Sequence, residues 1–201
     1  MKKNIYGGRF FVFEGLNGSG KSEQVKRLEK YFDGRGLPVF LTKEPTQWTE
    51  AGKKIKNILE ENEKTAPLKL QEFFTQDRAE HLEKEIIPML RGGKTVISDR
   101  YAFSSMAFGG IDVPLHKLIS LNDNFVCPDK IILLRVSPEE CLRRIGSRGN
   151  NIRLFEKLDK MRKVAANYEI LAESKRFKTA FVVIDGEKSA EMVHQEILAV
   201  L

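Results

Sequence analysis

Five short and nearly continuous apolar runs recur along the chain between longer stretches of mixed character. Strands that are buried on both faces of a parallel sheet give runs of this kind, whereas half-exposed strands alternate apolar and polar residues. We therefore predict five strands of a parallel sheet. The runs cover residues 10–13, 39–42, 95–98, 131–136 and 180–184.

The stretches between these runs show the 3.6-residue period of helices, with apolar residues recurring every three or four positions. Glycines follow the first and third of these patterns and predict helix ends there. Strands that alternate with helices predict a doubly wound α/β fold. There is no internal repeat or linker, so we expect one domain over residues 1–201. The predicted helical faces are Val25, Leu28 and Phe32; Ile55, Ile58 and Leu59; Leu82, Ile86 and Leu90; and Phe155, Leu158, Met161, Ala165 and Tyr168.

The composition is that of a soluble globular protein, with 41% hydrophobic and 31% charged residues in a chain of 201. No apolar run approaches the roughly eighteen residues that a membrane span needs. The first apolar run leads directly into a glycine-rich loop, so we interpret it as a strand and not as part of a signal peptide. These features predict a cytoplasmic protein without membrane association.

The net charge of +6 favours anionic partners. Nucleotides and nucleic acids both qualify, but the chain has no basic tail and no aromatic RNA-binding motif, which favours nucleotides over nucleic acid. The two cysteines, Cys127 and Cys141, form no CxxC pair, and the three histidines are scattered. A metal site built from cysteine and histidine is therefore not expected.

A phosphate-binding loop stands between the first predicted strand and the first predicted helix. Its sequence, GLNGSGKS, satisfies the pattern GxxxxGK[ST] in the context that the pattern requires. The glycines allow backbone N–H groups to point inward at phosphate oxygens, and the start of the helix adds its positive dipole end. Lys21 is expected to reach the β- and γ-phosphates, and Ser22 to ligate Mg²⁺. The predicted ATP-binding residues are Gly15, Leu16, Asn17, Gly18, Ser19, Gly20, Lys21 and Ser22.

A second feature supports a nucleoside triphosphate site. The third apolar run ends in Asp99, and an acidic residue at the end of a neighbouring strand is typically placed beside the Mg²⁺ of such a site. We therefore predict Mg²⁺ as cofactor, held by Ser22 and Asp99, with ATP as phosphoryl donor.

Further motifs give the chain a family resemblance. Between residue 9 and about residue 170 it resembles the thymidylate kinases, and the matching stretches occur in that family's order. The resemblance implies a P-loop NTPase fold with a five-stranded parallel sheet flanked by helices on both faces, and a homodimer. It also implies transfer of the γ-phosphoryl group of ATP to dTMP, giving dTDP and ADP. The stretches are FEGLNGSGKSEQ, Glu44-Pro45, FTQDR at 74–78, DRYAFSSMAFGG at 99–110, Pro128-Asp129 and VSPEECLRRIGSRG at 136–149.

The implied reaction needs cations more than it needs a general base. The 5′-phosphate of dTMP is already an anion, so the main obstacle is the repulsion between two polyanions. Catalysis by positioning and charge neutralisation follows from this. The resemblance assigns catalytic roles to Lys21 and Arg100, and to Arg148 and Arg153 in a lid segment at about 143–156. Arg143 and Arg144 are either further lid cations or solvated helix charges.

The resemblance also implies an acceptor site. Phe74 matches the ring that stacks on thymine, and Arg78, one helical turn later, matches the donor to a base carbonyl. Arg100 matches the residue that holds the acceptor phosphate. Lys43 stands where many members carry an arginine. The lysine keeps the positive charge but lacks the bidentate guanidinium of arginine. The remaining substrate-binding candidates are Ser104 and Ser105 at the base, Phe108 at the sugar, and Asn17.

Asn17 departs from the family pattern, which usually has aspartate at this position near the acceptor sugar and the metal. The asparagine amide oxygen still accepts a hydrogen bond but carries no charge. We expect the contact to the sugar hydroxyl to persist and any charge-dependent help to Mg²⁺ to be weaker.

Two other functions are compatible with the phosphate loop. One is a kinase for another nucleoside monophosphate, or a nucleoside kinase that uses Glu14 as general base. The other is a catalytically inactive P-loop nucleotide-binding protein. The motif at 99–110 favours a monophosphate acceptor, and the presence of Lys21, Ser22, Asp99 and Arg100 favours an active enzyme.

Overall fold

The computed structural model describes residues 1–147 and 157–201. Its centre is a parallel sheet of five strands in the order β2-β3-β1-β4-β5. The predicted α/β fold with a five-stranded parallel sheet is thus confirmed, and each strand lies within one residue of its predicted bounds. The strands are β1 Phe10–Glu14, β2 Val39–Lys43, β3 Thr95–Asp99, β4 Lys130–Arg135 and β5 Phe181–Asp185.

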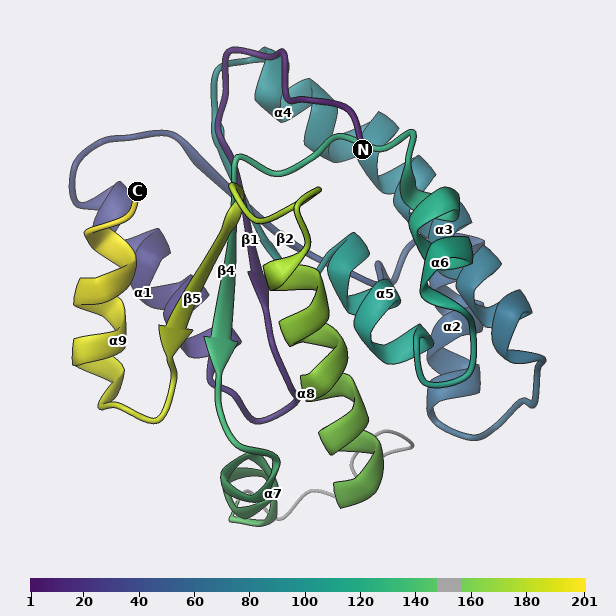
Figure 1. Ribbon diagram of the computed structural model, residues 1–201. Helices are drawn as coiled ribbons and strands as arrows, with labels where there is room; N and C mark the ends of the chain where they lie inside the picture. Colours follow the sequence, from purple (N-terminus) through teal and green to yellow (C-terminus); the bar gives the residue numbers. More distant parts are fainter. Residues whose placement is uncertain (148–156) are drawn as a thin grey trace.

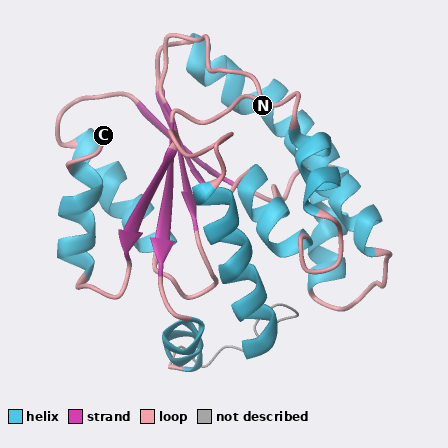
Figure 2. Cartoon of the chain, in the orientation of Figure 1, coloured by secondary structure: helices cyan, strands magenta, loops and turns pink. Residues whose placement is uncertain are grey.

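Helices cover both faces of the sheet (Figure 1). Helices α1 and α9 pack on one face, and α5 and α8, with the long helical stretch that begins at α3, cover the other. Figure 2 shows the same layers by type of structure. The helices are α1 Lys21–Asp33, α2 Glu50–Leu59, α3 Pro67–His81, α4 Ile87–Arg91, α5 Ala102–Gly109, α6 Leu115–Asn122, α7 Pro138–Gly146, α8 Leu158–Glu173 and α9 Ala190–Leu198.

The side chains of β1 explain why its sequence is continuously apolar. Phe10 and Val12 join the core on the α5 and α8 side, whereas Phe11 and Phe13 join the core on the α1 and α9 side. All four are 2% exposed or less. A strand that feeds two cores has no polar face, so the alternation of a half-exposed strand is absent.

The predicted helix around Leu82, Ile86 and Leu90 differs from the structure in its local form. Residues Leu82–Ile86 form a π-helical turn that joins α3 to α4. Pro88 lacks an N–H and its ring would clash with the carbonyl of residue 84 in a regular α-helix, so a widened turn at this point relieves the conflict. The three predicted apolar residues are all buried, as expected.

The residues with predicted roles in phosphate and metal binding lie at the carboxyl ends of the strands. Phe13 of β1 and Lys43 of β2 are both paired in register with Asp99 of β3. The phosphate loop, the end of β3 and the start of α5 therefore meet at one edge. Among the described helices, none has the length and apolar character that crossing a membrane requires.

Candidate active site

The phosphate loop adopts a backbone that only glycine accommodates easily. Gly15 and Gly18 have φ angles of 138° and 85°, in the region that L-residues avoid. A Cβ on Gly15 would lie 2.7 Å from the Leu134 carbonyl oxygen, and one on Gly18 would lie 2.6 Å from the Cys141 carbonyl oxygen. Both the local conformation and the close packing against β4 and α7 therefore require these glycines.

Lys21, the first residue of α1, folds back over this loop. Its ammonium donates hydrogen bonds to the carbonyl oxygens of Leu16 at 2.9 Å and Gly15 at 3.2 Å. The side chain is buried, and this burial, together with the positive charge of Arg100, lowers the pKa of the ammonium to about 7. An anionic phosphate in the loop would offset both effects, because opposite charge favours the protonated amine.

Ser22 and Asp99 lie together beside the loop. The Ser22 hydroxyl donates to Asp99 Oδ2 at 2.6 Å, which joins the start of α1 to the end of β3. Among the described residues no cluster of three or more acidic, histidine or cysteine side chains could hold a metal alone. Mg²⁺ in kinases commonly uses one or two protein oxygens together with substrate phosphates and water. A hydroxyl and a carboxylate at this spacing fit that requirement.

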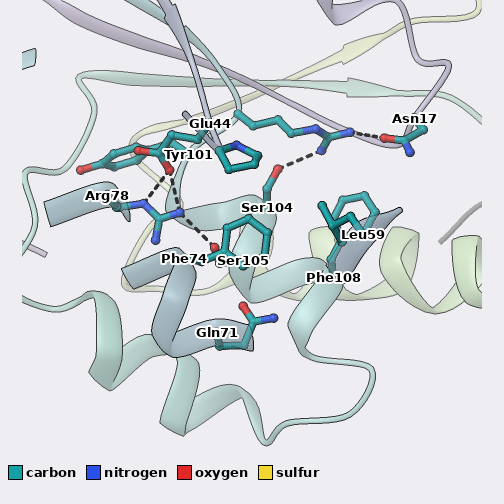
Figure 3. Close-up of a pocket in the computed structure, with 12 residues that line it drawn as sticks. Asn17, Glu44, Leu59, Gln71, Phe74, Arg78, Tyr101, Ser104, Ser105 and Phe108 are labelled. Atoms are coloured by element: carbon teal, nitrogen blue, oxygen red, sulfur yellow. Dashed lines mark hydrogen bonds and ion pairs between the residues drawn. The ribbon is translucent and has the colours of Figure 1, made fainter. Parts of the chain in front are cut away.

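A pocket of about 200 Å³ opens beside the phosphate loop, between α3 and α5 (Figure 3). Its two ends differ in character. Asn17, a phosphate-loop residue that accepts a hydrogen bond from Arg100, lies at one end, whereas Gln71 lies away from it. The lining residues are Asn17, Glu44, Pro45, Leu59, Gln71, Phe74, Arg78, Arg100, Tyr101, Ser104, Ser105 and Phe108.

Arg78 is held rigidly in the wall of this pocket. It is 1% exposed, so it is not a solvated helix charge. Its guanidinium donates to Glu44 through Nε at 2.8 Å, to Asn122 through Nη1 at 2.6 Å and to Ser105 through Nη2 at 2.9 Å. Nη2 also lies 2.7 Å from Glu44. Arginine has five N–H groups, and these described contacts use four of them, which leaves one on Nη1.

Asp77, the residue before Arg78, holds the loop beside the pocket in place. Its buried carboxylate accepts hydrogen bonds from the Thr46 backbone N–H at 2.9 Å, from the Thr46 hydroxyl at 2.5 Å and from the Thr49 hydroxyl. The loop that contains the pocket residue Pro45 is thereby attached to α3. Sequence reasoning assigned no role to Asp77, although its place beside Arg78 in the FTQDR motif was a usable signal.

Arg100 connects the phosphate loop to the pocket. Its backbone has a φ of 76°, an uncommon value for a residue other than glycine. The guanidinium donates to the Gly15 carbonyl at 3.1 Å, to the Ser104 hydroxyl at 2.9 Å and to the Asn17 side-chain oxygen at 2.5 Å. Its central carbon is also 5.0 Å from the centre of the Phe108 ring. One cation thus contacts the loop that would hold ATP and the pocket beside it.

Glu14, which immediately precedes the loop, forms a buried hydrogen-bond network. Its carboxylate accepts from the backbone N–H groups of Tyr101 at 2.9 Å and Ser104 at 3.1 Å. It also accepts from the hydroxyls of Ser104 at 2.6 Å and Tyr168 at 2.8 Å. Burial raises the pKa of this carboxyl group, while Arg100 opposes the rise. Both oxygens are engaged and Glu14 does not line the pocket, so the geometry does not favour Glu14 as a general base.

Comparison with known proteins decides the family. The family model described as thymidylate kinase matches residues 13–197. The chain belongs to the thymidylate kinase family. The family assignment that the motifs predicted is thereby confirmed, as is the activity of the family, ATP-dependent phosphorylation of dTMP to dTDP.

Several curated thymidylate kinases resemble the chain over almost its whole length. The probable thymidylate kinase of Pyrococcus abyssi is 39% identical over 200 residues, and that of Thermococcus kodakarensis is 39% identical over 203. The thymidylate kinase of Caldicellulosiruptor saccharolyticus is 37% identical over 201 residues. In each case the match covers 96% of both chains.

The structure places most of the residues that the thymidylate kinase motifs assigned to the acceptor site in one pocket. Phe74, Arg78, Arg100, Ser104, Ser105 and Phe108 line it together with Asn17. Lys43 does not line the pocket; it is exposed at the end of β2, beside Asp99 in register. Sequence reasoning assigned no site role to Glu44, although the Glu44-Pro45 pair was among the matching stretches. It missed Gln71, although Gln71 shares a helical face with Phe74 and Arg78.

The arginines of the predicted lid segment divide into two groups. Arg148 and Arg153 lie outside the described residues. Arg143 is exposed and donates to Glu140 at 2.6 and 2.7 Å, as a solvated helix charge would. Arg144 donates to Glu140 at 2.7 Å and to the Gly186 carbonyl at 3.0 Å, which links α7 to the turn after β5.

Proposed function

We propose that the pocket between α3 and α5 binds dTMP and that the phosphate loop binds ATP, so that the γ-phosphoryl group passes directly between them. The observation that carries this proposal is the placement of Arg100, which contacts both the loop carbonyl of Gly15 and the pocket residues Ser104 and Asn17. A cation at this junction would meet both phosphates of the reaction.

On the donor side, the loop N–H groups and Lys21 would hold the β- and γ-phosphates. Lys21 is free to leave the carbonyls of Gly15 and Leu16, because a phosphate offers its ammonium a charged acceptor in their place. Ser22 and Asp99 would hold Mg²⁺, which when bound neutralises phosphate charge.

On the acceptor side, each proposed role follows from where a residue lies. Phe74 would stack on the base, since its half-buried ring lines the pocket and also packs against the cluster of Ile55, Ile58 and Leu70. Arg78 would donate its remaining N–H to a base carbonyl, with Glu44 and Asn122 fixing its plane. The other proposed contacts are Ser105 at the base, Phe108 and Asn17 at the sugar, and Arg100 at the 5′-phosphate.

Ser104 fits a positioning role better than a base contact. Its hydroxyl accepts from Arg100 and donates to Glu14, which leaves it between a buried carboxylate and the phosphate-binding arginine. We propose that it orients Arg100. Arg148 and Arg153 remain proposed as additional cations on the basis of the sequence, within a single kinase domain of residues 1–201. Lys43 remains proposed near the acceptor phosphate on the same basis.

Selectivity among acceptors tests the proposed site. We expect purified protein with Mg²⁺ and ATP to phosphorylate dTMP well ahead of dUMP, dCMP, dGMP and UMP in a coupled ADP-release assay. Against dCMP the physical reason is that Arg78 offers a donor, which complements the carbonyl of thymine and not the amino group of cytosine. The preference over dUMP, dGMP and UMP rests on the family resemblance. Turnover of another monophosphate with dTMP inert would overturn the acceptor assignment. ATP binding without turnover of any acceptor would favour an inactive nucleotide-binding protein.

We also propose a homodimer, which the family resemblance implies. Trp48 and Leu68, next to α2 and on α3, are 40% and 39% exposed and offer apolar surface to a second copy. Size-exclusion chromatography with light scattering should give a mass of twice the chain mass of 23.0 kDa. A mass of one chain at micromolar concentration would contradict the proposal.

A further inference from the structure

Gln71 places a buried carboxamide at the end of the pocket away from Asn17 (Figure 3). The residue is 4% exposed and lines the pocket. Its side-chain oxygen has no hydrogen-bond partner among the described residues. A buried carbonyl oxygen without a partner is costly, and the few examples in native proteins call for an explanation.

Packing from two helices fixes the carboxamide in this place. Gln71 precedes Phe74 by three residues and Arg78 by seven, so the three side chains share one face of α3. On the facing helix α5, Gly109 lies directly against it: a Cβ there would come within 2.6 Å of the Gln71 carboxamide carbon. The missing side chain of Gly109 therefore provides the space that the carboxamide fills.

Other side-chain acceptors near Arg78 already have hydrogen-bond partners, unlike the Gln71 oxygen. The Ser105 hydroxyl accepts from Arg78, and the Glu44 carboxylate contacts Arg78 and, at 3.2 Å, His81. Arg78 itself can only donate. A ligand that presents a carbonyl to Arg78 and an adjacent N–H needs one more acceptor. The oxygen of Gln71 can supply it.

We propose that Gln71 is a specificity-determining residue whose side-chain oxygen accepts a hydrogen bond from the N3–H of the acceptor base. The inference rests on the proposed binding of the monophosphate in this pocket. Thymine and uracil carry a carbonyl beside an N–H on this edge, which matches the donor of Arg78 and the acceptor of Gln71. Cytosine carries an amino group beside an unprotonated ring nitrogen. Its amino group would therefore meet the donor of Arg78, and its ring nitrogen would meet the acceptor oxygen of Gln71.

A pair of ligands that differ only on this edge isolates the effect. dTMP and 5-methyl-dCMP share the methyl group, the sugar and the phosphate. Calorimetry should show that the wild-type protein binds dTMP more tightly. In Gln71→Met, which keeps the length of the side chain and removes its hydrogen bonding, dTMP affinity should fall about tenfold and 5-methyl-dCMP affinity should change little. The ratio of the dissociation constants of 5-methyl-dCMP and dTMP should therefore fall about tenfold.

A matched control and the contrary outcomes make the test specific. Gln76 is an exposed glutamine on the same helix, and Gln76→Met should leave both affinities unchanged. An equal loss for both ligands in Gln71→Met, or an unchanged ratio, would reduce Gln71 to a packing role. Failure of the wild-type protein to bind dTMP would overturn the acceptor assignment itself. Gln71→Asn, which withdraws the oxygen by one methylene, gives the same comparison if the methionine variant does not fold.

Discussion

Replacing Lys21 with alanine should lower the rate of phosphoryl transfer on the order of a thousandfold or more, with the fold retained. The ammonium lies inside the phosphate loop, where it would meet the charge that develops on the transferred group. The ammonium donates to two loop carbonyls, but Gly15 and Gly18 also pack closely against β4 and α7, and we expect this packing to hold the loop when the ammonium is removed. The measurement is kcat at saturating ATP and dTMP, with circular dichroism to confirm folding.

Lys26→Ala is the matched control, because Lys26 is an exposed lysine of the same helix. It should retain wild-type kcat. Substantial activity in Lys21→Ala would remove this lysine from the mechanism.

The lowered pKa of Lys21 adds an independent readout. With a pKa of about 7 in the unliganded protein, the amine is mostly neutral at pH 8. Bound phosphates raise this pKa, so ATP binding at pH 8 should take up close to one proton. Calorimetry in buffers of different ionisation enthalpy measures the uptake, which should vanish in Lys21→Ala.

Replacing Arg100 with methionine should lower kcat/KM for dTMP by roughly a hundredfold to a thousandfold. The variant loses charge-assisted contacts to the acceptor phosphate and also the links to Gly15, Asn17 and Ser104 that hold the two halves of the site together. We expect KM for dTMP to rise and kcat to fall, because in the proposed mode of binding the same cation holds the acceptor phosphate and offsets repulsion during transfer. Steady-state kinetics with dTMP varied at saturating ATP separates the two effects.

Arg91→Met provides the comparison, because Arg91 is exposed at the end of α4. It should leave the kinetics unchanged. If Arg100→Met kept normal kcat/KM for dTMP, the acceptor phosphate would have to bind elsewhere. Arg100→Lys should recover only part of the loss, since an ammonium cannot reproduce three contacts made by a planar guanidinium.

The strands could be predicted closely because a strand buried on both faces gives a continuous apolar run in the sequence, as in Phe10, Phe11, Val12 and Phe13. The strand order could not, because β1 lies between β3 and β4 through contacts distant in sequence. The π-helical turn before Pro88 was also missed. Helical periodicity records which face is buried and is insensitive to one widened turn.

The candidate site was predictable where a motif carried it. The motifs located Phe74, Arg78 and Arg100, which all line the pocket. Their supporting residues were not predictable in the same way, because Glu44 and Asn122 lie 34 and 44 positions from Arg78. The hydrogen bonds that turn Ser104 toward Glu14 and Arg100 depend on three separate elements meeting.

Glu14 has a consequence for how the enzyme handles its two substrates. Its carboxylate ties the end of β1 to the first turn of α5 and to α8 through four hydrogen bonds. The strand that leads into the proposed ATP site and the helix that lines the proposed dTMP site are thus joined by one buried network. If the two nucleotides bind as proposed, the fold itself sets the distance between their phosphates, because Glu14 holds the two binding elements together before either substrate is present.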